Sequence, residues 1–201
     1  NMSYSMRPSK FKETKYFEYI KENREALYAH SDKSNIDGLL KRTIIYSFPR
    51  QNPPSDEELA AAIDEVLPGL GEQTVELQNV QKLIGKARND DNAKAEFIER
   101  AIALMNYYDI NDSNSLNTIA WFMHEFTEDA AILQKAKAYA QKSIKTDSNS
   151  MNNDTLAAIC YKLKEKEAAM KHAKLAIQLA KENDQDASGT EELLEKIEAL
   201  K

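Results

Sequence analysis

The sequence has few of the residues that interrupt helices and almost none that could staple a fold covalently. Its 201 residues include five glycines, five prolines and a single cysteine. One cysteine excludes a disulfide within the chain and a C-x-x-C pair. A chain of this length buries roughly 70% of the surface that its unfolded form exposes, so it needs no staple. Alanine, leucine, glutamate and lysine abound and valine is scarce, so helix propensity predicts an all-α fold.

Long apolar runs and dense clusters of positive charge are missing as well. No window of 18 apolar residues exists, so we expect no membrane span. The pattern typical of a signal peptide, a positively charged segment followed by an apolar one, does not occur in this sequence either. The net charge of −6 divides into +4 for residues 1–55 (ten Lys/Arg against six Asp/Glu) and −10 for the rest (17 against 27). An acidic bulk disfavours nucleic acid as a partner, because phosphates are bound by clustered cations.

Patterns that carry catalysis or bind metals are also absent. The three histidines, His30, His124 and His172, lie in different predicted helices, and none has a histidine or cysteine three or four residues later. No glycine-rich phosphate loop, G-x-S-x-G or H-E-x-x-H motif occurs, and acidic pairs lie where helices begin, as the helix dipole favours. We therefore expect no metal, no cofactor and no enzymatic activity in this chain.

The first half of the chain shows helical periodicity interrupted by turn residues. Residues 10–30 predict one long amphipathic helix, and residues 36–48 predict a second. Two prolines then stop the pattern, so residues 49–55 are predicted to be a connection, with Ser55 well placed to begin the next helix. Residues 1–50 are accordingly interpreted as an N-terminal helical segment.

Three further helices are predicted between this segment and the last third of the chain. They cover residues 56–70, 74–87 and 92–108, separated by Gly, Pro and Asn/Asp clusters, with Asn92 as the expected N-cap of the third. Residues 55–110 are interpreted as a degenerate helical hairpin region.

The last 90 residues contain an internal repeat with an offset of 37 residues. The segment SLNTIAWFMHEFTEDAAILQKAKAYAQKSIKTDSN aligns with MNNDTLAAICYKLKEKEAAMKHAKLAIQLAKEND. The alignment pairs Ile119-Ala120 with Leu156-Ala157, Met123 with Cys160, Ala136 with Ala173, and Tyr139-Ala140 with Ala176-Ile177. Each copy predicts a helical hairpin, and Cys160, in the position of Met123, is expected to be a small buried hydrophobe.

A closing helix is predicted after the second hairpin. Residues Ser188 to Glu191 have the S-x-x-E form of a capping box. Residues 113–201 are thus interpreted as two hairpins followed by a capping helix, as a stack of repeats requires.

Stacked hairpins turn one face of their first helices into an extended concave surface. We expect that surface to bind a protein or peptide partner. In the repeat register it carries Asn114, Asn117, Trp121 and His124 from one copy and Met151, Asp154, Ala158 and Tyr161 from the other. Trp121, the single tryptophan, is suited to anchor a ligand. The alternative is that its ring fills the gap between the hairpins.

The spacing of small residues resembles that of the tetratricopeptide repeat. Ala157, Ala169, Ala173 and Ala176 match its small positions, and Leu156 and Cys160 match two of its apolar ones. The resemblance implies stacked antiparallel hairpins that form an α-solenoid. The predicted surface lacks the lysines and arginines with which some tetratricopeptide domains clamp a peptide's terminal carboxylate, so recognition of that kind is not expected.

Several blocks together resemble one family, the C-terminal helical region of thioredoxin-like proteins of the Bacteroidetes type. The blocks are YFEYIKENREALY, SLNTIAWFMHEFTED, LQKAKAYAQKSI, NNDTLAAICYKL, EAAMKHAKLAIQLAK and GTEELLEKI. The resemblance implies a thioredoxin-fold domain with a C-x-x-C pair ahead of this region, in a protein exported to the periplasm. The function expected from it is that of a non-catalytic interaction domain beside an oxidoreductase, and the alternative is a stand-alone repeat scaffold with no redox link.

Overall fold

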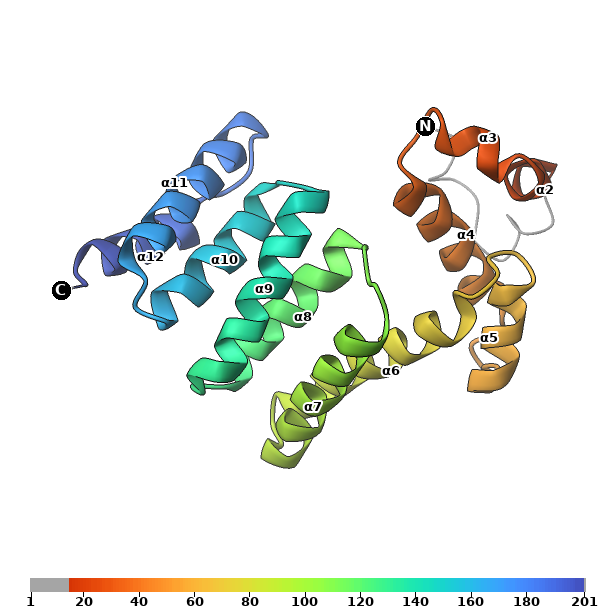
Figure 1. Ribbon diagram of the computed structural model, residues 1–201, viewed down its shortest axis with the longest axis horizontal. Coiled ribbons are helices and arrows are strands. Elements are labelled where there is room, and N and C mark those ends of the chain that lie inside the picture. Colours follow the sequence, from red (N-terminus) through yellow and green to blue (C-terminus); the bar gives the residue numbers. More distant parts are fainter. Residues whose placement is uncertain (1–14, 201) are drawn as a thin grey trace. The chain divides into compact units, whose positions relative to one another are not determined.

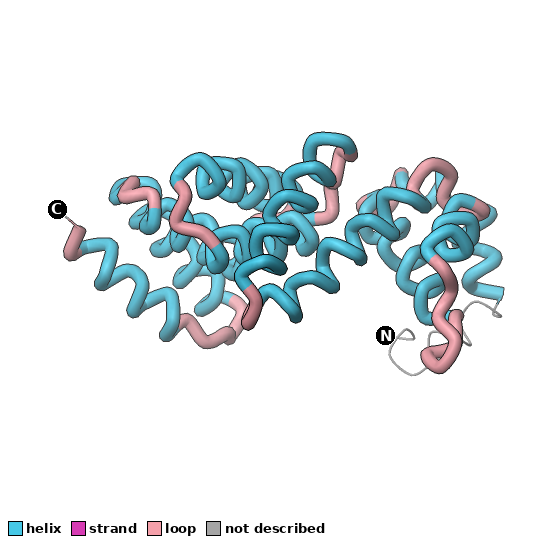
Figure 2. Tube along the Cα trace, turned by 90° about the horizontal axis from the view of Figure 1, so that it is seen from below, coloured by secondary structure: helices cyan, strands magenta, loops and turns pink. Residues whose placement is uncertain are grey.

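The computed structural model describes residues 15–200, and every regular element in that range is a helix (Figures 1 and 2). The all-α prediction is therefore confirmed for the described residues. The helices are α2 (Lys15–Glu22), α3 (Arg24–Tyr28), α4 (Lys33–Ser47), α5 (Asp56–Asp64), α6 (Gly71–Ala87), α7 (Asp91–Tyr107), α8 (Ser113–Phe126), α9 (Ala130–Thr146), α10 (Ser150–Lys162), α11 (Lys166–Glu182) and α12 (Ser188–Glu198).

The chain divides into two compact units, one up to Asn79 and the other from Val80 onward. The boundary falls within α6 and inside the range 55–110 that the sequence analysis treats as one region. The predicted division into residues 1–50, 55–110 and 113–201 stays a prediction. None of the helices in residues 15–200 is long and apolar enough to cross a membrane.

In the first unit, the prediction of one unbroken helix over residues 10–30 is wrong. The helix is interrupted at Asn23, which separates α2 from α3, and residues 10–14 lie outside the described residues. The Asn23 side-chain amide donates to the carbonyl of Tyr19 at 2.9 Å, the same carbonyl that receives the Asn23 backbone N–H at 3.0 Å. A short amide side chain thus competes for the helical acceptor and distorts the turn.

The core of the first unit joins α2, α4, α5 and the start of α6. Its buried members are Phe17, Leu40, Ile44, Leu59, Ile63, Val66, Leu67 and Val75. Helix α5 begins with a complete capping box, in which the Ser55 hydroxyl accepts from the Glu58 N–H at 3.2 Å and the Glu58 carboxylate accepts from the Ser55 N–H at 2.8 Å. The start predicted at Ser55 is therefore confirmed, and its reciprocal bonds satisfy two free N–H groups.

Gly71 lets α6 begin directly against α5. Its N–H donates to the Asp64 carboxylate at 2.8 Å, and a Cβ built on it would stand 2.2 Å from the carbonyl oxygen of Ala60. The close approach of the two backbones therefore requires glycine at this position.

In the second unit, α8 pairs with α9 and α10 pairs with α11, each pair joined by a three-residue connection, and each of these helices packs against the next (Figure 1). The N-caps of α8 and α10, Asp112 and Asn149, are 37 residues apart (149 − 112). The aligned positions are buried in both copies: Ile119 and Leu156, Ala120 and Ala157, Met123 and Cys160, Ala136 and Ala173. The alanines among them, Ala120, Ala157, Ala136 and Ala173, allow the two helices of each pair to approach closely.

Two predicted helix starts in this unit are wrong. Helix α7 is capped by Asp90, not Asn92, because one Asp90 oxygen accepts from the N–H groups of both Asn92 and Ala93. At α12 no capping box forms; Ala187 is the N-cap, and the Ser188 hydroxyl donates instead to the Asp186 carboxylate at 3.0 Å.

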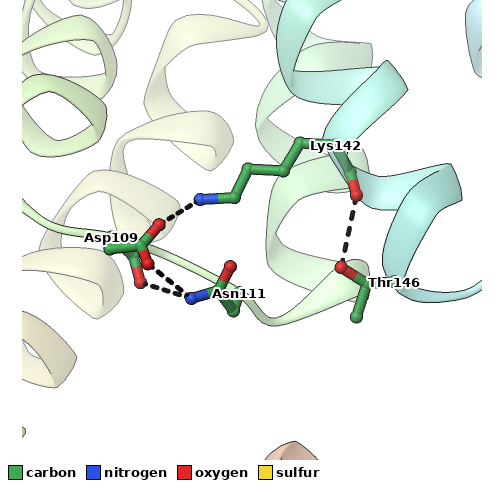
Figure 3. Close-up of polar contacts among 4 residues, drawn as sticks. All are labelled: Asp109, Asn111, Lys142 and Thr146. Carbon is green, nitrogen blue, oxygen red and sulfur yellow. Dashed lines mark hydrogen bonds and ion pairs between the residues drawn. The ribbon is translucent and has the colours of Figure 1, made fainter.

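Polar contacts hold the connection between α7 and α8 against α9 (Figure 3). Asp109 forms an ion pair with Lys142, and the Asn111 side-chain amide donates to the other carboxylate oxygen of Asp109 at 2.9 Å. Within α9, the Thr146 hydroxyl donates to the Lys142 carbonyl at 3.2 Å, one turn earlier. These bonds fix the point from which α8 departs.

A buried polar cluster joins the two helix pairs. The hydroxyls of Ser113 and Ser143 lie 3.1 Å apart, and the Asn152 amide donates to Ser113 Oγ at 2.8 Å and to the Asp147 carbonyl at 2.7 Å. All three side chains are buried. These hydrogen bonds offset the free-energy cost of removing the three polar side chains from water. They also fix the register of α10 on α8 and α9.

Candidate functional site

An open groove of about 440 Å³ lies on the second unit, between residues of α8, α10 and α12. It is formed by Trp121, His124, Asp154, Ala158, Tyr161, Asp186, Gly189, Thr190, Leu193 and Lys196. Its walls are therefore the first helix of each pair together with the final helix and the residues that lead into it. Clefts of this size with a few converging polar groups are the usual form of binding sites.

Of the eight residues predicted on the concave surface, four with polar or aromatic side chains line this groove: Trp121 and His124 from α8, and Asp154 and Tyr161 from α10. The structure brings them together because α8 and α10 lie in adjacent pairs and the residues occupy one face of each helix. Ala158, also predicted on this surface, forms part of the groove.

The other predicted residues lie outside the groove lining. Asn114 is exposed at the start of α8, and Met151, at the start of α10, is 62% exposed. Asn117 is half-buried one turn before Trp121, and its Oδ1 atom is buried without a hydrogen-bond partner among the described residues. Whether any of these three residues contacts a partner stays a prediction.

The α8 wall presents two neighbouring rings that are tilted by 39° to each other. The centroids of Trp121 and His124 lie 5.3 Å apart. Burial, with the nearby Lys162 ammonium as the second cause, lowers the pKa of His124 from its ordinary 6.5 to about 4. The imidazole is therefore neutral at pH 7, and this wall is aromatic and uncharged.

Lys162 holds the end of α8 against α10. Its ammonium donates to the carbonyls of His124 and Thr127, each at 2.8 Å, and pairs with Glu128 at 2.7 Å. These bonds satisfy carbonyls that the end of α8 leaves free and fix where the Trp121 and His124 rings stand relative to α10.

The α10 wall carries the half-buried carboxylate of Asp154. The Thr190 hydroxyl of α12 donates to Asp154 Oδ1 at 2.7 Å. Burial raises the pKa of Asp154 above its ordinary value, and the Thr190 bond lowers it in part. Tyr161 stands two turns further along the same wall, with the buried Ala158 between them.

The α12 wall was missed by the sequence analysis. It supplies Gly189, Thr190, Leu193 and Lys196, and Asp186 precedes it. The offset of 37 residues was a usable signal, because it carries Asp154 onto residue 191, within the first turn of α12. The final helix was interpreted only as a cap, so its inner face was not included in the predicted surface.

Neither an activated thiol nor a cluster of metal-binding side chains occurs within residues 15–200. Cys160 is free and 1% exposed, and burial raises the pKa of its thiol to about 12, so it is not an activated nucleophile. No group of three or more His, Cys, Asp or Glu side chains within residues 15–200 is placed to hold a metal ion. The groups that the groove offers to a ligand include aromatic rings and the half-buried carboxylate of Asp154.

Comparison with known proteins identified no relative: no family model, no curated protein and no solved structure matches the chain.

Proposed function

We propose that residues 113–200 form a tetratricopeptide-like helical-repeat module that binds an extended segment of a partner protein in the groove. The observation that carries the proposal is that α8, α10 and α12 each contribute side chains to one hollow, although they come from successive parts of the chain. Side chains from three helices can meet several residues of an extended segment, and Trp121 supplies the large, partly exposed ring typical of an anchor. In this proposal the chain itself catalyses no reaction.

The periodicity supports the repeat assignment. The N-caps of α8 and α10 recur after 37 residues, α9 and α11 have 17 residues each, and the aligned small residues are buried in both copies. A stack of such pairs needs a final helix to cover its open end, and α12 packs on α11 in that position.

Selection of binding peptides from a random display library on the full chain tests the module. We expect the selected peptides to change the fluorescence of Trp121, the single tryptophan, and Trp121→Ala to weaken their binding about tenfold or more with helicity unchanged. Tyr107→Ala is the matched control, because this aromatic ring of the same unit is 78% exposed and lies outside the groove.

Two results would overturn the assignment. Equal weakening by the two variants would place the binding surface elsewhere. Loss of helicity in Trp121→Ala, with unchanged binding by Trp121→Phe, would assign the ring to the core.

We further propose, from the family resemblance, that this module is the companion of an exported, periplasmic thioredoxin-like oxidoreductase. The six sequence blocks and their order support this part of the proposal. Mass spectrometry with peptide mapping of the protein from its source cells tests it. A mature chain longer by about 100 to 150 residues and containing a C-x-x-C peptide is expected, whereas a chain without such a domain would leave the alternative, a stand-alone repeat scaffold.

A further inference from the structure

Asp154 is a partly buried carboxylate that has no positively charged partner among the described residues. It is half-buried in the groove wall, and its one hydrogen bond from a side chain is that of Thr190, at 2.7 Å on Oδ1. Within residues 15–200 no lysine, arginine or histidine side chain forms an ion pair with it. A partly buried carboxylate without a counter-charge is costly, so a ligand that brings one gains more here than at a solvated acid.

The groove that holds Asp154 is lined in part by aromatic side chains. Trp121 and Tyr161 line the same groove, and His124, whose ring lies next to that of Trp121, is neutral at pH 7. A planar cation suits such a site, because it donates several hydrogen bonds to acceptors and stacks on rings.

The charges at the rim favour a cationic ligand over an anionic one. The groove contains two acids, Asp154 and Asp186, against one lysine, Lys196. Lys196 is exposed, so water and salt screen its charge, whereas Asp154 is half-buried and screened less.

We infer that the groove binds the partner segment through an arginine side chain, whose guanidinium pairs with the Asp154 carboxylate and stacks on the Trp121 ring. This inference rests on the function proposed above and names the chemistry of the partner: an extended segment with arginine flanked by apolar residues. Leu193 and Ala158 supply the apolar surface for those flanking residues.

The test uses three blocked peptides, acetylated and amidated at their ends, of the form Ala-Leu-Xaa-Leu-Ala. Xaa is arginine, citrulline, which keeps the shape without the charge, or glutamate. Titration of the full chain, followed by Trp121 fluorescence, is expected to show the arginine peptide binding at least about tenfold more tightly than the citrulline peptide. The difference is expected to shrink as salt is added.

Two variants place the preference on one carboxylate. Asp154→Asn keeps the acceptor for the Thr190 hydroxyl and removes the charge, and it is expected to bind the arginine and citrulline peptides alike. Glu192→Gln, at an exposed acid of α12 that lies outside the groove lining, is the matched control and is expected to keep the preference within about twofold. Because the peptide comparison on the unmodified chain needs no variant, a misfolded variant does not prevent a decision.

Each failure has a distinct meaning. Equal binding of arginine and citrulline peptides, tighter binding of the glutamate peptide, or a preference that survives in Asp154→Asn would overturn the arginine inference while leaving peptide binding in the groove intact. The absence of saturable binding by all three peptides up to millimolar concentration would overturn the inference. Failure of the display selection as well would remove the proposed function.

Discussion

At the scale of single residues, burial in the groove shifts the pKa values of two side chains that line it. Burial lowers the pKa of His124 and raises that of Asp154, so both shifts favour the neutral form. The two groups come from different helices, α8 and α10, and respond to the same loss of water. The groove is therefore an environment in which an opposite charge brought by a ligand is screened weakly.

Stability is predicted to depend on pH through His124. Its folded-state pKa of about 4 lies below the ordinary 6.5, so on acidification the unfolded chain takes up the proton first. The contribution of His124 to stability is therefore complete above pH 6.5 and is lost as the pH falls toward 4, by up to about 3 kcal/mol for a side chain only 14% exposed. His124→Gln is expected to lose this part of the pH dependence in urea unfolding at pH 4.5 and 7. Identical pH dependence in the two proteins would contradict the prediction.

The grouping of Trp121, His124, Asp154 and Tyr161 could be predicted because it needs only two regularities. Helical spacing puts Trp121 and His124 on one face of their helix and Asp154 and Tyr161 on one face of theirs. The offset of 37 residues puts these two helices in adjacent hairpins. The same offset carries Asp154 into the first turn of α12, but only the position is repeated and not the sequence, so the α12 side chains that complete the groove were not predicted. How far the groove extends along α8 depends on where α12 packs, so the position of Asn114 relative to it was also undetermined.

At the scale of helices, local sequence predicted where helices occur better than where they begin. Ser55 begins α5 as predicted, and it forms a capping box with Glu58. In Arg-Asn-Asp-Asp-Asn, several side chains can cap, and Asp90 is the one that reaches two N–H groups. At α12 the Ser188 hydroxyl donates to the Asp186 carboxylate, and at the end of α2 the Asn23 amide donates to a helical carbonyl. Such competition between neighbouring short polar side chains is decided by geometry that a motif does not contain.

A pair of glycines on α6 is predicted to respond in opposite ways to alanine. Gly71→Ala brings a Cβ to 2.2 Å from the Ala60 carbonyl oxygen, a backbone atom that cannot move aside alone, and is expected to destabilise the first unit by about 2 kcal/mol. Gly85→Ala meets nothing within 4 Å and is expected to stabilise by about 0.5 to 1 kcal/mol. Urea unfolding of both variants measures the difference, and similar effects at the two sites would contradict it.

At the scale of the whole molecule, the two helix pairs of the second unit are joined by hydrogen bonds as well as by apolar packing. Ser113 comes from the start of α8, Ser143 from the end of α9, and Asn152 from the start of α10. Their side chains are buried and satisfy one another. Such a network is costly when one member is lost, because the remaining polar atoms stay buried without partners.

Asn152→Ala is therefore predicted to destabilise the second unit by about 1 to 3 kcal/mol, because Ser113 Oγ and the Asp147 carbonyl lose a donor. Asn114→Ala is the matched control: this asparagine is exposed on α8, and its loss is expected to change stability by less than about 0.5 kcal/mol. Chemical unfolding followed by circular dichroism measures both. A small effect of Asn152→Ala would mean that apolar contacts alone hold the joint.

The same polar joint determines the order in which these hairpins can follow one another. Shifted by 37 residues, the positions of Ser113 and Ser143 correspond to Ser150 and Ala180, and that of Asn152 corresponds to Ser115. If the two hairpins were exchanged, Ser150 and Ala180 would stand where Ser113 and Ser143 form their hydrogen bond. Ser115, whose side chain is shorter, would stand where the Asn152 amide donates. The hairpins are thus similar in shape but not interchangeable, and an engineer who lengthens this array must transplant the serine pair and the asparagine together with each new unit.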